Sequence, residues 1–423
     1  MIERQPPRIV VVGAGYAGLS TALRLARQAG GRARVEVVDG RAEHQLITRL
    51  HEVAAGRLAP AAAAVPLGIL LAGTDIRLHR AWVEGIDLER GQVTTSAGLL
   101  QYDTLVLAPG SRTDYRGVRG AAEYSLPLRT LEDALRLREK VGTHLRQAAR
   151  TGDAERDSRF TFLVVGGGYT GIELAAELAY RSGRRTDGTR IGLLEAGPRL
   201  LPGGDGWLAR EAAAGLERLG VQLFLGTPAV SVDARGVQVQ GGEIGARHVV
   251  WATGVRAPRL LAESGLHVNG DGRALVDRSL AATGHSEVLV LGDAAAALDS
   301  ADLPLPSSAQ VAVQQAKWAA DNLAAALRGR ATEPFVPWLE GEALSLGPHD
   351  GLARVRRLAL ADAPAVLVKR LARARYLSQL GRPALPVFQC ARQHQWDWMP
   401  QPPAAHTSAA EGSRRGVVSE RAA

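Results

Sequence analysis

Two glycine-rich turns constrain the fold of this chain more than any other feature of its sequence. Residues 13–18 read Gly-Ala-Gly-Tyr-Ala-Gly, and residues 166–171 read Gly-Gly-Gly-Tyr-Thr-Gly. Each turn follows a β-branched run and opens a helical pattern, a setting in which such glycines let the backbone approach a pyrophosphate and the helix pack closely on the strand. The positive end of the helix dipole then faces the phosphates. Two copies about 150 residues apart predict two dinucleotide-binding units.

Each turn also has the second strand and the acidic residue that such a unit needs. Strands are predicted at 8–12 and 34–38 around the first turn, and the second of them ends on Asp39. The second turn lies between strands predicted at 160–165 and 191–194, followed by Glu195. A carboxylate at this place accepts hydrogen bonds from ribose hydroxyls and repels a 2′-phosphate. Glu195 therefore favours NADH over NADPH, with Arg199 close behind it as a contrary signal.

Further segments extend these units into an α/β pattern. Apolar runs predict strands at 92–96, 102–107, 248–252 and 288–291, while residues 128–150 have the period of an amphipathic helix. The polar stretches 151–159 and 181–189 are expected to be loops.

The strand predicted at 288–291 leads into Gly292 and Asp293. The aspartate is expected to hold ribityl and pyrophosphate oxygens, and the helix that follows to point at the flavin. The alternative for this feature alone is a plain Gly-Asp turn. A single dinucleotide site would suit an ordinary dehydrogenase, whereas two sites in this order suit a flavoprotein that takes hydride from NADH.

These motifs resemble the flavoprotein superfamily with two dinucleotide-binding domains. Over residues 8–383 the chain is similar in detail to type II NADH dehydrogenases, the single-subunit NADH:quinone oxidoreductases that do not pump protons. The likeness rests on residues 44–54, 168–178 and 309–315, the last with the sequence Ala-Gln-Val-Ala-Val-Gln-Gln. The chain departs from the family pattern at Pro109, where threonine is usual, near Thr48, where proline is frequent, and at Asp39, where glutamate is frequent.

The resemblance implies that NADH passes hydride to FAD, and that electrons then reach a membrane quinone, either ubiquinone or menaquinone. Gln310 and Gln314 are expected to lie beside the flavin and line the quinone pocket. Glu173 is expected near the flavin, the nicotinamide or the quinone path. The alternative for the glutamines is an ordinary polar helix start, and for Glu173 it is an acid that stabilises a helix dipole.

The candidate site residues follow from these motifs. The candidate catalytic residues are Glu173, Gln310 and Gln314. The candidate FAD-binding residues are Gly13, Ala14, Gly15, Tyr16, Ala17, Gly18, Asp39, Val83, Ala108, Gly110, Gly292, Asp293, Ala309 and Gln310. The candidate NADH-binding residues are Gly166, Gly168, Tyr169, Thr170, Gly171, Glu173, Glu195, Thr253 and Gly254. No metal site is expected, because the ten histidines are scattered and lack ligand spacing.

The number of cysteines separates this chain from related chemistries. Cys390 is its only cysteine and lies far beyond the flavin motifs. Disulfide reductases of the superfamily need a redox-active cysteine pair, and sulfide:quinone oxidoreductases also work through cysteines. Both chemistries are therefore disfavoured. A chain without a disulfide also fits the cytoplasm.

A basic cluster near the C-terminus suggests contact with anions. On a helical wheel over 366–376, Leu367, Val368, Leu371, Ala372 and Ala374 share one side and Lys369, Arg370 and Arg373 the other. The helix is expected to end near Tyr376. A basic amphipathic helix of this kind is typical of an anionic lipid surface. The alternative is a helix packed on the flavin domain with a solvated basic face, while nucleic acid is disfavoured because no recognition motif accompanies the charge.

The chain has 423 residues, more than one hydrophobic core usually supports, and its 46% apolar content excludes disorder as the main state. The predicted fold is α/β, with two Rossmann-like domains and a C-terminal amphipathic helical segment. The predicted boundaries are 1–117 with 276–345 for FAD, 118–275 for NADH, 346–399 for membrane association and 400–423 for a disordered tail.

The expected location is the cytoplasmic face of the cell membrane, since we see neither a signal peptide nor a spanning segment in the sequence. A homodimer is considered as the assembly. Two other functions stay open. One is a soluble NAD(P)H-dependent flavin reductase for ferredoxin- or rubredoxin-type acceptors, and the other is a redox-sensing flavoprotein.

Overall fold

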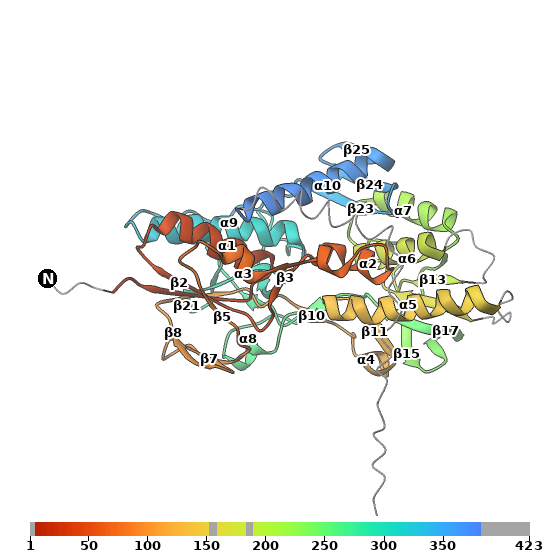
Figure 1. The fold of residues 1–423 in the computed structure, drawn as a ribbon, viewed down its shortest axis with the longest axis horizontal. Coiled ribbons are helices and arrows are strands. Elements are labelled where there is room, and N and C mark those ends of the chain that lie inside the picture. Colours follow the sequence, from red (N-terminus) through yellow and green to blue (C-terminus); the bar gives the residue numbers. More distant parts are fainter. Residues whose placement is uncertain (1–4, 152–158, 183–188, 382–423) are drawn as a thin grey trace, which may run out of the picture.

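The computed structural model describes residues 5–151, 159–182 and 189–381. Figure 1 shows two lobes side by side, with the last described elements lying along one side of both. Cys390, the tail 400–423 and the larger part of the predicted loops 151–159 and 181–189 lie outside the described residues. The α/β fold class predicted from the sequence is confirmed, and two mixed sheets, each built around parallel strands, form the centres of the lobes.

The first lobe contains a six-stranded sheet in the order β20-β21-β9-β1-β2-β5. Its central strand β1 pairs in parallel with β2 and β9, and Ile9 to Val12 are buried because both faces of the sheet are covered. Helices α1 and α9 pack side by side on one face, where Arg24 forms a bidentate ion pair with Asp321. The bounds are β1 Arg8–Val12, α1 Tyr16–Ala29, β2 Arg34–Val38, β5 Arg77–His79, β9 Thr104–Leu107, β20 Ala281–Ala282, β21 His285–Val290 and α9 Ala309–Ala326.

The second lobe contains a seven-stranded sheet whose main order is β14-β13-β12-β17-β16-β15, with β11 paired to β17. The central strand β12 is buried along its whole length. The bounds are β11 Ser125–Pro127, α5 Leu131–Thr151, β12 Phe160–Val165, α6 Tyr169–Ser182, β13 Ile191–Leu194, α7 Gly206–Arg218, β14 Gln222–Phe224, β15 Ala229–Asp233, β16 Gly236–Val239 and β17 Gly242–Trp251.

Shorter elements connect and cover these sheets. The antiparallel pair β10 and β18 joins the lobes, and β6, β7 and β8 form a small sheet. Their bounds are β10 Arg112–Thr113, β18 Val255–Arg256, β6 Val83–Asp87, β7 Gln92–Thr95 and β8 Gly98–Gln101. The remaining elements are β3 Glu43–Gln45, α2 Leu50–Ala54, β4 Ala64–Pro66, α3 Leu67–Leu71, α4 Ala121–Tyr124, α8 Leu260–Glu263, β19 Ala274–Leu275 and β22 Ala295–Ala296.

Helix α2 lies in the first third of the chain but packs in the core of the second lobe. Leu50, Val53 and Ala54 belong to the same buried cluster as Ile172 and Leu174 of α6. A segment that the sequence places with the FAD unit therefore contributes to the core of the NADH unit.

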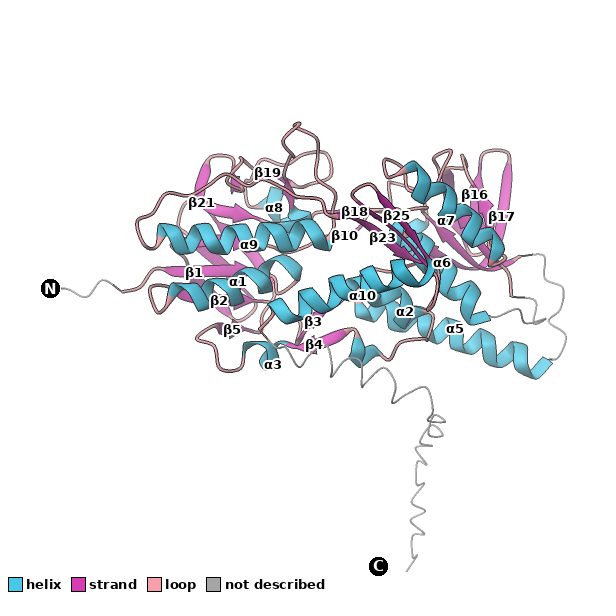
Figure 2. Cartoon of the chain, turned by 90° about the horizontal axis from the view of Figure 1, so that it is seen from above, coloured by secondary structure: helices cyan, strands magenta, loops and turns pink. Residues whose placement is uncertain are grey.

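The C-terminal unit is a three-stranded antiparallel sheet followed by a helix. The strands are β23 Gly341–Ser345, β24 Gly351–Val355 and β25 Leu358–Ala361, and the helix is α10 Asp362–Gln379. The sequence predicted only a helix here, and its predicted end near Tyr376 was wrong by one turn. Figure 2 shows α10 running between the two lobes.

The side of α10 that packs on the protein is not the apolar side of the helical wheel. Its inward stripe contains Ala365, Tyr376 and Leu380, all buried, and Lys369 lies on the same side. Residues four, seven and four positions apart form one stripe on an α-helix. Leu367 and Leu371, on the apolar side of the wheel, are 55% and 59% exposed, so this side is not packed on the flavin domain as the alternative required. In the described part of the chain we find no helix with the length and apolar character needed to cross a membrane.

Candidate functional site

Two glycines of the first loop leave no room for a side chain, whereas the third faces open space. A Cβ at Gly13 would lie 2.3 Å from the Ala108 carbonyl oxygen, and one at Gly18 would lie 1.9 Å from the oxygen of Gly13. Gly15, which precedes α1, has no described atom within 4 Å of the same position. The loop is thus a tight turn with open space in front of a helix N-terminus, the shape that a dinucleotide pyrophosphate requires.

The second glycine loop repeats this geometry in the other lobe. A Cβ at Gly166 would lie 2.5 Å from the Ala252 oxygen, and one at Gly171 would lie 1.9 Å from the Gly166 oxygen. Gly168 again faces open space. The residues present therefore fit two dinucleotides, one in each lobe.

Each acidic residue ties its loop to the neighbouring turn. Asp39 accepts hydrogen bonds from the backbone N–H groups of Ala14, at 2.7 Å, and Arg41, at 2.8 Å. Glu195 accepts equivalent bonds from Gly167 and Gly197, at 2.6 and 2.7 Å. Each carboxylate keeps further lone pairs for ribose hydroxyls.

The guanidinium of Arg199 donates from both terminal nitrogens to the carbonyl of Gly204, at 3.2 Å. Its position after Glu195 thus does not make it a partner of that carboxylate.

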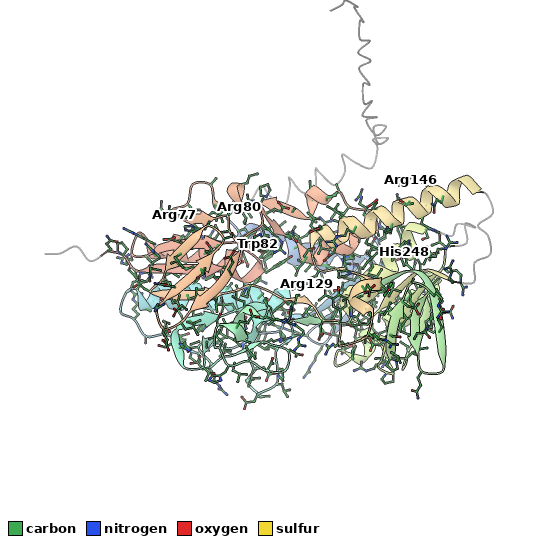
Figure 3. The ribbon with its side chains drawn as sticks, turned by 90° about the horizontal axis from the view of Figure 1, so that it is seen from below. Arg77, Arg80, Trp82, Arg129, Arg146 and His248 are labelled. Atoms are coloured by element: carbon green, nitrogen blue, oxygen red, sulfur yellow. The ribbon has the colours of Figure 1, made fainter. Side chains whose placement is uncertain are left out.

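The turn at Gly292 and Asp293 is held by three residues that the sequence did not single out. Gln315, 1% exposed, accepts the Gly292 N–H at 2.6 Å. Arg129 donates to Asp293 Oδ2 at 2.5 Å, and the Ser111 hydroxyl donates to the same atom at 2.6 Å. Figure 3 shows Arg129 where the two lobes meet. Gln315 is the last residue of the motif at 309–315, so the sequence contained a signal for it. Arg129 belongs to no motif and could not be found in this way.

The starts of α1 and α9 meet at this turn. A Cβ at Gly292 would lie 3.4 Å from the Ala17 side chain and 3.6 Å from that of Ala312. Asp293 lies within a single 3-10 turn, Gly292–Ala294, and the helix expected to follow it begins only at Ala309. The structure therefore brings the first glycine loop, Asp293 and the glutamine helix together, through a longer connection than the sequence predicted.

The other candidate nucleotide residues lie around the two loops. Ala108 packs beneath Gly13, and Gly110 has a left-handed backbone, with φ of 71°. The Thr253 hydroxyl donates to the Asp114 carbonyl at 3.0 Å, and Gly254 lies against the Arg116 guanidinium. Val83 begins β6, while Tyr169 and Thr170 begin α6.

Glu173 lies at a junction of three parts of the molecule. It is 7% exposed, and its Oε1 accepts from Lys369 Nζ on α10 and from the Ser345 N–H, at 2.9 Å, at the end of β23. Its Oε2 lies 3.4 Å from His51 Nδ1 on α2. An acid that merely stabilised a helix dipole would be exposed in the first turn, so this environment favours the functional interpretation of Glu173.

The protonation of this cluster is set by burial and by one cation. Burial alone would raise the pKa of Glu173, but the Lys369 ammonium, with the His51 ring and the hydrogen bonds, lowers it. Burial also lowers the pKa of His51. The site therefore holds a carboxylate–ammonium pair beside a neutral imidazole.

Gln310 and Gln314 both face the segment that connects α9 to β23. Gln314 donates to the Trp338 carbonyl at 2.6 Å and accepts the Trp338 N–H at 2.8 Å. With its amide in the orientation that satisfies both ends, Gln310 donates to the Gly341 carbonyl and accepts the Glu340 N–H. The two carboxamides thus line the space between the start of α9 and residues 338–341.

The first glycine loop also contacts α10. The Tyr16 ring stacks on the Tyr376 ring, with centroids 4.5 Å apart and planes 25° apart. His44 bridges the two elements, because its Nδ1 lies 2.9 Å from the Ala14 carbonyl oxygen and its Nε2 lies 2.8 Å from the Tyr376 hydroxyl.

Comparison with known proteins agrees with this geometry. The family model of pyridine nucleotide-disulphide oxidoreductases matches residues 7–316. The type II NADH:quinone oxidoreductases of Staphylococcus saprophyticus and Staphylococcus aureus are each 30% identical to the chain, over 88% of its length and 96% of theirs.

Solved structures share the fold at lower identity. NDH2 from Plasmodium falciparum in complex with NADH matches with a TM-score of 0.78 at 15% identity, covering 92% of this chain and 98% of that one. The sulfide:quinone oxidoreductase of Aquifex aeolicus matches with a TM-score of 0.76 at 19% identity, covering 89% and 92%.

Proposed function

The chain belongs to the pyridine nucleotide-disulphide oxidoreductases and, among them, to the type II NADH:quinone oxidoreductases, and from this premise we propose how its own residues carry out the reaction. It is an FAD-dependent enzyme that oxidises NADH and reduces a quinone. The observation that carries the mechanism is the pair of open glycine loops, one in each lobe, each with its acid. Bound FAD supplies a two-electron carrier between the two substrates.

The first loop, with Asp39 and Asp293, binds FAD, and the second loop, with Glu195, binds NADH. Gly15 and Gly168 leave the approach to each helix N-terminus open, so backbone N–H groups can reach the phosphates. Arg129 places a positive charge on Asp293 and so limits repulsion between this carboxylate and the phosphates. The lobes keep the two ligands in one orientation because α2 and α10 join them.

Glu173 and Lys369 handle a proton for the quinone. Conversion of a quinone to a quinol takes up two electrons and two protons, whereas NADH delivers two electrons with one proton. A second proton must therefore come from the protein or the solvent. The ammonium of Lys369 is partly exposed, and its Nζ donates to Glu173 Oε1. This pair can pass a proton inward from the solvent side.

Gln310 and Gln314 line the quinone pocket. Their amides lie next to the first turn of α9, and Ala312 of that turn lies near Gly292. Each carboxamide uses one N–H for the backbone of residues 338–341, and its second N–H can donate to a quinone carbonyl oxygen.

The C-terminal unit contacts an anionic lipid surface at the cytoplasmic face of the membrane. Large apolar side chains are exposed on this unit and its approach, with basic residues among them. The apolar residues are Val336, Trp338, Leu339, Leu358, Leu367 and Leu371, and the basic ones include Arg356, Arg370 and Arg375. Such a mixture is typical of an interfacial helix.

A homodimer is the assembly we propose, and analytical sedimentation of the purified holoenzyme tests it.

One kinetic experiment tests both the reaction and the role of Glu173. In stopped flow, the holoenzyme is mixed with NADH, and the loss of flavin absorbance gives the rate of flavin reduction. The reduced enzyme is then mixed with a short-chain quinone, and the recovery of flavin absorbance gives the rate of flavin oxidation. In Glu173→Gln we expect the second rate to fall at least about tenfold while the first stays close to wild type. The matched control is Glu132→Gln, whose ion pair with Arg136 is exposed and lies on α5, away from residues 338–341.

Equal slowing of both rates would show that Glu173 has only a structural role. Electron delivery to ferredoxin or rubredoxin faster than to quinone would instead favour the soluble reductase. An NADH-bound protein with negligible turnover would favour the redox sensor.

A further inference from the structure

A buried aromatic bridge connects the C-terminal helix to the first glycine loop. Tyr376 of α10 is 7% exposed and stacks on Tyr16, the first residue of α1. His44 is fully buried and contacts both partners through its two ring nitrogens. The Tyr16 hydroxyl is in turn within 3.1 Å of the Thr48 hydroxyl.

The direction of each hydrogen bond follows from the chemistry of the groups. A carbonyl oxygen can only accept, so His44 Nδ1 must carry the hydrogen and donate to Ala14. Burial lowers the pKa of His44 to about 4, so the ring is neutral near pH 7 and its Nε2 is an acceptor. Burial also raises the pKa of Tyr376 well above its ordinary value. The Tyr376 hydroxyl therefore donates to His44 Nε2.

The bridge holds the loop at two places on either side of its open glycine. His44 fixes the carbonyl of Ala14, and Tyr376 fixes the ring of Tyr16, while Gly15 between them faces open space. A loop whose backbone N–H groups are already aligned binds a phosphate more tightly than one that must be ordered first.

We propose that His44 and Tyr376 are positioning residues for FAD, so that docking of α10 and binding of FAD strengthen each other. The proposal rests on FAD occupying the first loop. Coupling between two binding events is reciprocal, so FAD must stabilise the docked helix as much as the docked helix stabilises FAD.

The first test measures the release of FAD from the full-length holoenzyme. After dilution, free flavin is followed by its fluorescence. Tyr376→Phe removes one hydroxyl and should speed release about 3- to 10-fold, and Tyr376→Ala, which also removes the stacked ring, should speed it further. The matched control is Tyr102→Phe, because the Tyr102 hydroxyl is buried without a hydrogen-bond partner among the described residues. This control should release FAD at the wild-type rate.

The second test measures the coupling at α10. Its main comparison uses the wild-type chain alone, so it does not require a variant to fold. Hydrogen exchange is measured on the wild-type chain with and without saturating FAD. Amides in 362–379 should exchange more slowly with FAD, and this slowing should shrink in Tyr376→Phe. Amides in 206–218, at α7 in the second lobe, provide the internal reference.

The outcomes separate the coupling from the flavin site itself. Release rates of both Tyr376 variants equal to wild type, or α10 exchange independent of FAD, would overturn the coupling while FAD binding stands. A wild-type chain that takes up no FAD would overturn the flavin assignment and the proposal together.

Discussion

The glycines of each nucleotide loop have different tasks. At Gly171 an added Cβ would lie 1.9 Å from the Gly166 oxygen, so this glycine permits the close packing of helix on strand. At Gly168 the same carbon would meet no described atom within 4 Å, so this glycine keeps space free for a ligand. Substitution of the two by alanine should therefore separate stability from binding.

We expect Gly171→Ala to lower stability by about 1–3 kcal/mol or more, because the helix must move away from the loop. Gly168→Ala should keep its melting temperature but raise the KM for NADH by about tenfold or more, since the methyl group occupies the approach to the phosphates. Thermal unfolding and steady-state kinetics distinguish the two. A lower melting temperature for Gly168→Ala, with unchanged KM, would contradict this division.

His44 should make stability depend on pH. Burial holds its pKa at about 4 in the folded chain, against an ordinary value of 6.5, so the unfolded chain binds the proton first as the pH falls. Stability is therefore lost between about pH 6.5 and pH 4, by about 3 kcal/mol for this group, and levels off below. Urea unfolding at several pH values measures it.

The control for this prediction is His44→Gln, which lacks the titrating ring. The stability advantage of wild type over the variant should shrink as the pH falls through this window. An advantage that is the same at pH 7 and near pH 4 would show that His44 does not titrate as expected.

The sequence predicted individual residues best where one side chain has one local task. Asp39 and Glu195 follow their strands directly, as expected, and each also accepts a backbone N–H of its own glycine loop. Their contact with ribose hydroxyls stays a prediction. Gln315 and Arg129 were missed because their partners are 23 and 164 residues away. The motif containing Gln310 and Gln314 was recognised. Their hydrogen bonds to the backbone at 338–341 could not be predicted, because the segment between α9 and β23 has no helical or strand periodicity.

At the scale of elements, strands with buried surroundings on both faces were predicted well. The bounds of β1, β2, β12 and β13 agree with the predictions, since apolar runs between a polar residue and a glycine or an acid leave little freedom. The C-terminal strands β23, β24 and β25 were missed because they contain few β-branched residues. The wheel grouped Lys369 with Arg370 and Arg373, but Lys369 faces the protein because it pairs with Glu173, a partner 196 residues away that the wheel does not include.

The exposed side of α10 should determine attachment to lipid. Leu371→Asp is expected to weaken binding to anionic vesicles about tenfold or more, because it removes apolar burial and adds a repelled charge. The matched control is Leu303→Asp, at a leucine that is 61% exposed on the first lobe. Co-sedimentation with vesicles measures both. Equal loss in both variants would place the lipid contact elsewhere.

At the scale of the whole molecule, charged side chains fix the segment after α2 in the second lobe. Arg57 forms a bidentate ion pair with Glu177 of α6, at 2.8 and 2.6 Å, and also contacts Glu52 of α2 at 3.2 Å. Glu177 is 0% exposed. The sequence gives no sign of this pairing, because the partners are 120 residues apart and belong to different predicted domains.

Arg57→Met should therefore destabilise the whole chain by about 3–5 kcal/mol, since the buried Glu177 loses its cation, while Glu52 keeps its pair with Arg49. Arg136→Met, which removes an exposed pair with Glu132, should cost about 1 kcal/mol or less. Chemical unfolding compares the two. Partial rescue by Glu177→Gln in the Arg57→Met background would confirm the cause, and two equally mild variants would refute it.

The position of α2 limits how the two lobes can be exchanged between related proteins. Leu50, Val53 and Leu58 fill the core of the lobe to which their neighbours in the chain do not belong. In a chimera joined between residues 117 and 118, the side chains of α2 would have to pack in the core of an NADH lobe taken from another protein. We expect such exchanges to succeed only when residues 46–63 travel with the lobe they fill. The two nucleotide units, although repeated in sequence, can thus be replaced only as an interlocked pair or with this piece carried along.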